Sequence, residues 1–169
     1  MDFSYPPEVE QFRKELRAWL AANLSQEVVA AGRGRDPDTF ETLRAWDATL
    51  ADAGWGAVSW PQEYGGRGAT VPEQLAYAEE TARARAPVPL NVIGMNNIAP
   101  AIMQYGTETQ KRELLPRMVR ADDIWCQGMS EPEAGSDLAS LRTRAVADGD
   151  DYVVSGQKIW TSLGHRADW

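Results

Sequence analysis

One short stretch of the sequence gathers residue types and spacings that suit the binding of a polar ligand. Residues 125–138, "WCQGMSEPEAGSDL", begin apolar, turn at a Glu-Pro pair, and then place Gly135, Ser136 and Asp137 in consecutive positions. A loop of this composition exposes backbone amides and hydroxyl groups, which donate hydrogen bonds. The same three residues also occur in ordinary surface loops, so other parts of the sequence must decide between the two interpretations.

Single residues elsewhere exclude several kinds of chemistry. His165 is the only histidine, which removes most zinc sites and makes Ser-His catalysis improbable, so we predict no metal site and place His165 on the surface or in a loop. The only cysteine, Cys126, cannot form an intrachain disulfide. It lies between apolar neighbours that predict a buried strand, and this usage fits a reducing cytoplasm.

Charge and hydropathy narrow the class of protein further. The 169 residues include 17 basic and 25 acidic side chains, and the formal net charge of −8 disfavours nucleic acid binding. The first residues, "MDFSYPPEVEQF", carry acids where a signal peptide needs basic residues. Because no apolar run approaches the ~20 residues that cross a bilayer, the sequence predicts a cytoplasmic protein without a membrane segment.

The first part of the chain has helical periodicity. Pro7 suits the first turn of one helix, and a second is expected to begin with an N-cap at Asp36 before Pro37 and to end near Gly54. The apolar stripes of these two helices are Phe12, Leu16, Trp19, Leu20 and Phe40, Leu43, Trp46, Leu50. Residues 55–70 are too rich in glycine for a regular element and predict an ordered loop pinned by Trp55, Trp60 and Tyr64.

Three further helices are expected before residue 121. Thr70 with Glu73, and Thr107 with Gln110, have the spacing of capping boxes, so helices should follow each pair, to about residue 86 and through residue 119. Between them, residues 90–105 carry isoleucines on one side of a helix. Pro100 lies inside this stretch and should kink the helix or restart it.

After residue 121 the apolar period changes from about 3.6 to two, which is typical of strands. Strands are predicted over 123–129 and 141–148, a turn at "GDD", and two short strands within 152–162 around Gly156. Such a sheet has unpaired edges, so we expect more polypeptide after Trp169. The predicted fold class is α+β: a helical bundle domain over 1–121, then the start of an antiparallel, β-barrel-like domain over 122–169.

Several motifs occur together in a familiar order. "WPQEYGGRG", "YGTETQKRELLP", "MSEPEAGSDL", "GQKIWTS" and "GHRADW" are each weak, but as a set they resemble the acyl-CoA dehydrogenase family along the whole chain. The resemblance implies a flavoenzyme of lipid degradation that uses FAD to desaturate an acyl-CoA thioester between its α and β carbons. It also implies a C-terminal four-helix domain, absent from this sequence, which carries the glutamate base, so no catalytic residue is expected here.

The resemblance assigns the cofactor contacts to two segments. Gly135 and Ser136 would approach the phosphates of FAD and the pantetheine arm, while Trp160 would lie against the flavin and Ser162 near its N5 atom. The complete predicted set for FAD is Gln127, Gly128, Met129, Ser130, Gly135, Ser136, Trp160, Thr161 and Ser162. Gln127 stands where many family members have an aromatic or hydrophobic residue, so an amide would replace the stacking partner of the flavin. Serines replace the commoner threonine at positions 130 and 162, and each keeps a hydroxyl.

The same resemblance suggests a substrate surface and partners. Ser136 would contact the thioester ligand, and Met95, Ile98, Ala99 and Ile102 would wall the acyl pocket, although a stripe of this kind is more often helix core. Expected partners are acyl-CoA, an electron-transfer flavoprotein, and further subunits in a homodimer, homotetramer or heteromer.

Other interpretations stay open from the sequence. Glu131 and Asp137 are assigned to holding the turn, with Asp137 capping its own loop amides. Trp160 alone would equally fit a core tryptophan on a strand. The chain could be a non-catalytic half-subunit, or a flavin oxidase or monooxygenase of the same fold, and the type of acyl group cannot be deduced.

Overall fold

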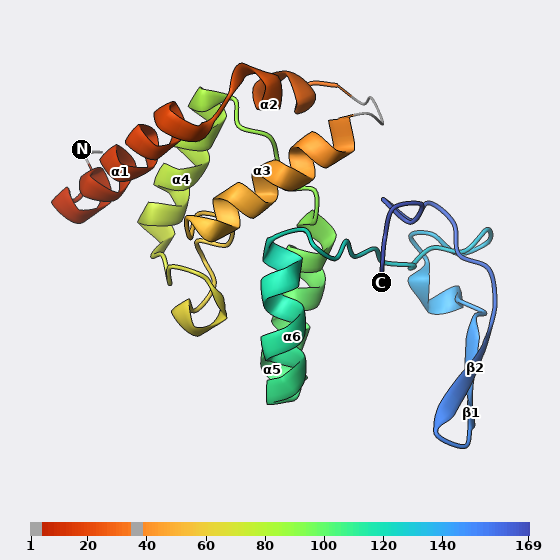
Figure 1. The fold of residues 1–169 in the computed structure, drawn as a ribbon. Coiled ribbons are helices and arrows are strands. Elements are labelled where there is room, and N and C mark those ends of the chain that lie inside the picture. Colours follow the sequence, from red (N-terminus) through yellow and green to blue (C-terminus); the bar gives the residue numbers. More distant parts are fainter. Residues whose placement is uncertain (1–4, 35–38) are drawn as a thin grey trace. The chain divides into compact units, whose positions relative to one another are not determined.

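The computed structural model describes residues 5–34 and 39–169, and the chain divides into two compact units, Met1–Asp123 and Ile124–Trp169. Helices make up the first unit, whereas loops and one hairpin make up the second (Figure 1). The α+β class predicted from the change of period is therefore confirmed.

The first unit contains six α-helices and a π-helical turn within the described residues. Their bounds are α1 Pro7–Asn23, α2 Gln26–Ala31, α3 Phe40–Asp52, α4 Val71–Ala84, η3 Gly94–Ile98, α5 Ala99–Tyr105 and α6 Glu108–Val119. The sequence did not predict α2, whose N-cap Ser25 accepts a hydrogen bond from the Val28 amide. The expected N-cap at Asp36 lies outside the described residues; the residue before α3 is Thr39.

Both predicted capping boxes are confirmed. The Thr70 amide donates to the Glu73 carboxylate at 2.7 Å, and the Gln110 amide donates to the Thr107 hydroxyl at 3.2 Å. Pro100 falls in the first turn of α5, so the expected restart is correct: one helix is replaced by a π-helical turn followed by α5. A proline lacks an amide hydrogen, and the first turn of a helix does not need that donor.

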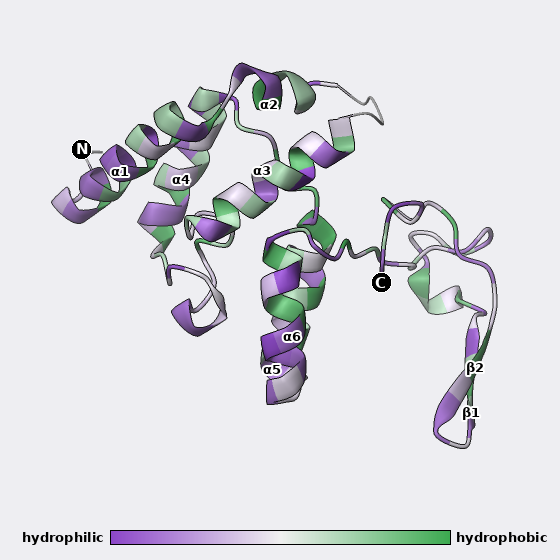
Figure 2. Cartoon of the chain, in the orientation of Figure 1, coloured by the Kyte–Doolittle hydropathy of each residue, from purple (hydrophilic) through white to green (hydrophobic). Residues whose placement is uncertain are grey.

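The core of the first unit is built on α1, α3 and the loop after α3. Figure 2 shows hydrophobic and hydrophilic residues alternating around α1, α3 and α4, as expected when one face of each helix is buried. Phe12 packs edge-on against Trp55 with 5.2 Å between ring centroids, and the Arg67 guanidinium lies 3.5 Å from the Trp55 centroid. Trp55 and Trp60 are buried, so the predicted anchoring of this loop by tryptophans is confirmed.

The second unit contains a single hairpin within the described residues. β1 Arg144–Asp148 pairs antiparallel with β2 Asp151–Ser155, with Val146 opposite Val153, and Gly149 adopts a φ of 63° in the turn. The strands predicted over 123–129 and 157–162 are wrong, because both stretches are irregular. They make isolated backbone hydrogen bonds, such as Ile159 N–H to the Ser130 carbonyl at 2.9 Å, and no continuous ladder.

Candidate functional site

The two segments that carry the predicted cofactor residues lie next to one another in the second unit. The Ile159 amide donates to the Ser130 carbonyl at 2.9 Å, and the Lys158 ammonium donates to the Met129 carbonyl at 3.0 Å. The indole of Trp160 comes within 3.9 Å of the point where Gly135 would carry a Cβ. The structure thus brings together residues from both predicted segments, which are separated by about thirty positions in the chain.

Trp160 has an unusual backbone conformation and an exposed side chain. Its φ is 54°, in the left-handed region that non-glycine residues seldom adopt and that costs about 1–3 kcal/mol. Its indole is 80% exposed, so it is not a core tryptophan of this unit. Strained residues of this kind occur often at ligand sites, where the surrounding contacts hold the conformation.

The remaining predicted FAD residues form a mostly accessible surface. Gly128, Met129, Gly135, Ser136 and Ser162 are exposed, while Gln127, Ser130 and Thr161 are half-buried. Hydroxyls at positions 130, 136 and 162, backbone amides and one indole are the donors and the apolar wall that a flavin ring and its phosphates would require.

Glu131 holds the turn, as predicted. Its backbone forms an isolated antiparallel bridge with Ala134, and its carboxylate accepts hydrogen bonds from the amides of Arg142 at 2.7 Å and Thr143 at 2.9 Å. The Lys158 ammonium donates to the same carboxylate at 3.0 Å. Hydrogen bonding from Thr143 and from the Arg142 amide, reinforced by Lys158, lowers the pKa of Glu131 to about 2. Glu131 is therefore an anion that stabilises the turn through these hydrogen bonds.

The role predicted for Asp137 is wrong. Its carboxylate makes no capping bond to the short 3-10 turn η4, Leu138–Ser140; instead the Asp137 carbonyl accepts from the Ser140 amide at 3.2 Å and hydroxyl at 2.8 Å. The ψ of 71° at Asp137 differs from the extended conformation in which N-cap side chains reach the following amides. Asp137 is exposed, and the turn is fixed by Glu131.

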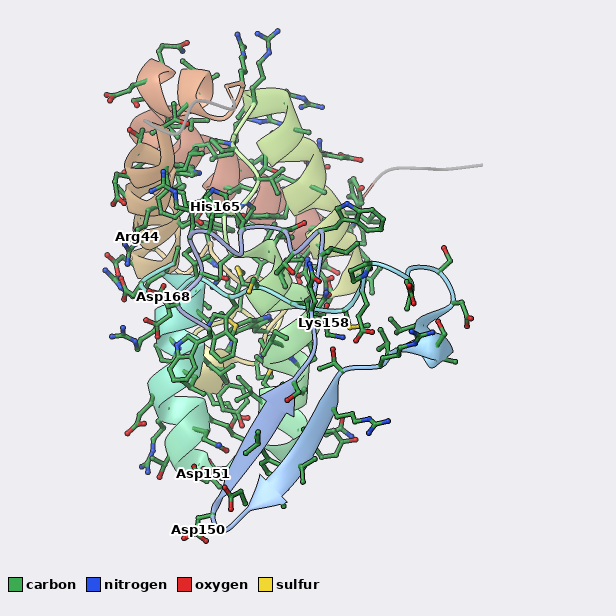
Figure 3. All side chains as sticks on the ribbon, turned by 90° about the vertical axis from the view of Figure 1, so that its right-hand side faces the viewer. Arg44, Asp150, Asp151, Lys158, His165 and Asp168 are labelled. Carbon is green, nitrogen blue, oxygen red and sulfur yellow. The ribbon has the colours of Figure 1, made fainter. Side chains whose placement is uncertain are left out.

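The last residues of the chain fold back on the start of the second unit. The Ile124 amide donates to the Asp168 carboxylate at 2.8 Å, the Cys126 amide donates to the Trp169 carbonyl at 3.0 Å, and Trp125 stacks on Trp169 at 5.4 Å. Cys126 is half-buried on irregular backbone, so the buried strand predicted for it is wrong. Figure 3 labels His165 and Asp168 on this C-terminal loop, where His165 is exposed as predicted.

The predicted acyl-pocket residues lie in the first unit, on η3 and α5. Met95 and Ala99 are buried, and Ile98 and Ile102 are half-buried. Their substrate role stays a prediction.

Several structurally important residues were not predicted from the sequence. Lys158 joins the two cofactor segments, and the fully buried Asn91 donates from Nδ2 to the carbonyls of Met118 at 2.8 Å and Asp123 at 2.9 Å. Gly94 lies beside Asn91, where a Cβ would come within 2.7 Å of the Asn91 Oδ1 atom. The one available signal was the polar type of Asn91 within an apolar stretch.

The described residues contain neither a metal-binding cluster nor a membrane-spanning helix. No group of three or more histidine, cysteine, aspartate or glutamate side chains there could hold a metal ion. None of the helices in residues 5–34 and 39–169 combines the length and apolarity required to span a bilayer.

Comparison with known proteins places the chain in a family. The sequence pattern described as "Acyl-CoA dehydrogenase, N-terminal domain" matches residues 6–122, and "Acyl-CoA dehydrogenase, middle domain" matches residues 126–169. Acyl-CoA dehydrogenase IpdE1 of Mycobacterium tuberculosis is 47% identical over 166 residues, which cover 96% of this chain and 43% of the relative. Acyl-CoA dehydrogenase FadE26 of the same organism is 46% identical over 172 residues, covering 100% and 42%.

Solved structures agree with these matches. The ChsE4-ChsE5 complex from Mycobacterium tuberculosis superposes with a TM-score of 0.80 at 46% identity, covering 99% of this chain and 42% of that chain. The Tcur3481-Tcur3483 steroid ACAD gives 0.78 at 39% identity, covering 99% and 43%. The 169 residues thus span less than half the length of these relatives. The chain belongs to the acyl-CoA dehydrogenase family of oxidoreductases.

Proposed function

We propose that the protein containing this chain is an FAD-dependent acyl-CoA dehydrogenase that desaturates an acyl-CoA thioester between its α and β carbons. The observation that carries the proposal is the contact between the two segments expected to bind the flavin, joined by the Ile159 to Ser130 hydrogen bond. The exposed indole of Trp160, beside Gly135, adds a broad apolar wall to the same surface.

The residues of this surface fit a flavin by their chemistry. Bound FAD would accept the hydride that leaves the β carbon of the substrate. The Ser130 and Ser162 hydroxyls are donors suited to a ring that gains electron density, the Trp160 indole would exclude water from its face, and Gly135 and Ser136 would approach phosphates and the pantetheine arm. The set proposed for FAD is Gln127, Gly128, Met129, Ser130, Gly135, Ser136, Trp160, Thr161 and Ser162.

The base that removes the α proton is proposed to come from outside these 169 residues. Glu131 is a buried carboxylate directly after Ser130, but three donors bind it and lower its pKa to about 2. A general base works best with a pKa near the working pH, so Glu131 is unsuited to that role.

The relatives suggest the substrate class and the assembly. One solved relative is a two-protein complex, and another is named as a steroid ACAD with two components. We propose that this chain acts on a bulky, steroid-derived acyl-CoA in a cytoplasmic complex with a second dehydrogenase chain, and passes electrons to an electron-transfer flavoprotein. Ser136, Met95, Ile98, Ala99 and Ile102 would contact the substrate.

A second candidate function follows from the assembly of one solved relative. One solved relative is a two-protein complex, and we propose as the alternative that this chain belongs to a heteromer in which it contributes part of a flavin site without catalysing the reaction itself. The other possible assembly is a homo-oligomer in which every copy is a complete subunit. The mass and composition of the purified complex would distinguish the homo-oligomer from the heteromer.

The test uses the protein purified from its own host with any further segments and partner chains in place. We expect a yellow protein whose flavin absorbance bleaches when steroid-derived acyl-CoA is added anaerobically, and bleaches much less with straight-chain acyl-CoA. Trp160→Ala should weaken FAD retention, since it removes the apolar wall. A colourless protein that cannot be reconstituted with FAD would rule out the proposed activity.

A further inference from the structure

A partly buried ion pair crosses between the two segments of the proposed flavin site. The Lys158 ammonium lies 3.0 Å from the Glu131 carboxylate, and the two side chains are 28% and 8% exposed. The same ammonium donates to the Met129 carbonyl at 3.0 Å. Figure 3 labels Lys158 on the loop just beyond β2.

The bonds around this pair are consecutive in both segments. Lys158 binds residues 129 and 131, and the next residue, Ile159, donates its amide to the carbonyl of Ser130 at 2.9 Å. Three successive residues of one segment are thus tied to two successive residues of the other. This pattern fixes the register of the two segments, although neither is a strand.

Both members of the pair are held in place by their surroundings. The amides of Arg142 and Thr143, just before β1, donate to the Glu131 carboxylate, so the anion cannot turn away from Lys158. The Lys158 stem passes over Gly128, where a Cβ would come within 3.2 Å of Lys158 Cγ. The absence of a side chain at Gly128 therefore leaves room for the Lys158 stem. This explains a glycine at position 128 without requiring that the backbone approach a cofactor there.

We propose that Lys158 and Glu131 are positioning residues of the flavin site: their ion pair sets the register of the two segments and thereby orients Trp160, two residues after the lysine, and Ser130, one residue before the glutamate. The inference rests on the proposed function. Lys158 would influence FAD binding through the two polypeptide segments that it joins, without contacting the cofactor.

The principal variant is Lys158→Met, which keeps the length of the stem and removes the ammonium. Loss of a charge-assisted hydrogen bond between the segments should raise the Kd for FAD by about tenfold. It should also speed amide hydrogen exchange at Ile159, whose acceptor lies on the partner segment. Lys158→Arg should restore most of the affinity, because it keeps the cation.

The matched control is Glu133→Gln, two residues from Glu131 on the same loop. Glu133 makes an exposed ion pair with Arg142 at 2.9 Å, with side chains 73% and 81% exposed, so its loss should leave both the Kd and the exchange at Ile159 unchanged. Thermal melting of each variant would show whether the fold is intact.

The outcomes separate this inference from the proposed function. Protein with the native Lys158 that binds no FAD would overturn both. Protein that binds FAD, with Lys158→Met showing the same Kd and the same exchange at Ile159, would overturn the positioning role alone. A tenfold weaker affinity that Lys158→Arg restores, and that Glu133→Gln does not reproduce, would support it.

Discussion

Asp47 is a buried carboxyl group that makes no ion pair with a cation among residues 5–34 and 39–169. It lies on α3, is 4% exposed, and accepts one hydrogen bond, from the Leu90 amide at 2.8 Å. Burial raises the pKa of Asp47 from 3.8 to about 7, because the charged form loses its hydration. The folded state therefore binds this proton more tightly than the unfolded state does.

Asp47→Asn should change how stability depends on pH. As pH rises from about 4 to about 7, the unfolded state ionises first, so the native protein loses stability relative to the variant. Asparagine has no charge and keeps an oxygen that can accept from Leu90. The variant should match the native protein near pH 4 and exceed its unfolding free energy above pH 7 by up to about 4 kcal/mol.

Urea unfolding at several pH values would measure this effect. Glu41→Gln, an exposed position on the same helix, serves as the control and should leave the pH dependence unchanged. Parallel stability curves for the native protein and Asp47→Asn would contradict the prediction.

Local sequence patterns could not predict the backbone conformation and the contacts of the residues that build the candidate site. The types of Trp160 and Ser130 were recognisable from motifs, whereas the left-handed backbone of Trp160 follows from contacts that no short pattern encodes. Glu131 and Lys158 are 27 positions apart, and part of the chain between them is irregular. No helical or strand period therefore relates the two residues. The wrong role for Asp137 arose because its residue type suits a cap, while its ψ does not.

At the scale of elements, α1 and α4 are joined by a cluster of charges around one glutamate. Glu80 on α4 is 2% exposed and accepts from Arg13 at 2.9 Å and Arg17 at 2.8 Å, both on α1, and from Arg83 at 3.3 Å. Hydrogen bonds from Arg17 and Arg13 lower the pKa of Glu80 to about 2. Because three guanidinium groups converge on one buried carboxylate, we expect the cluster to help set the rotation of α1 against α4.

Glu80→Gln should destabilise the first unit and remove part of its acid sensitivity. A folded pKa below the ordinary value of 4.5 means that the stabilising charge is present at neutral pH and is lost as pH falls from about 4.5 to about 2. At pH 7 we expect a loss of about 2 kcal/mol, reduced from the full effect because Arg17 is more than half exposed.

Thermal and urea unfolding at pH 7 and pH 3 would test this. Glu79→Gln is the neighbouring control: its side chain is 48% exposed and lies 3.4 Å from Arg13, so it should change stability little. Equal losses for the two variants, or an unchanged acid limb for Glu80→Gln, would be evidence against the cluster.

Helices were predicted better than strands for a physical reason. A helix forms its backbone hydrogen bonds within one segment, and capping residues and apolar periodicity mark it in the local sequence. The capping boxes at Thr70 and Thr107 are examples. The six-residue α2 was missed because it is too short to display a full stripe. The strand predicted over 123–129 is wrong because a strand needs a paired neighbour, and this stretch makes only isolated backbone hydrogen bonds with the described residues.

On the scale of the whole molecule, the β1–β2 hairpin has an apolar face that the described residues of its own unit leave exposed. The opposed pairs Ala145–Val154 and Ala147–Tyr152 share one face, which carries no charged side chain. The other face holds Val146–Val153 between the pairs Arg144–Ser155 and Asp148–Asp151, so it is only partly apolar. Tyr152 and Val154 are 70% and 66% exposed. Two-stranded hairpins are marginally stable in water, so we expect this face to be buried in the complete assembly.

Two adjacent valines provide a matched test of that expectation. Val154→Thr places a hydroxyl on the apolar face and should lower the stability of the complete protein by about 1–2 kcal/mol, because the hydroxyl would be buried without a partner. Val153→Thr, on the opposite face, should change it by less than about 0.5 kcal/mol. Calorimetry of the purified assembly gives both values, and equal shifts would show that the two faces are covered alike.

The residues at the boundary of the two units are each tied down by hydrogen bonds. The Asp123 carboxylate binds Arg117 at 2.5 and 2.6 Å and its carbonyl accepts from Asn91, while the next residue, Ile124, is 1% exposed and donates to Asp168. A protease needs accessible chain that can be drawn out into its cleft. Asp123 and Ile124 are each bound within their own unit, so we expect limited digestion to cleave exposed loops before it cleaves the chain at these two residues.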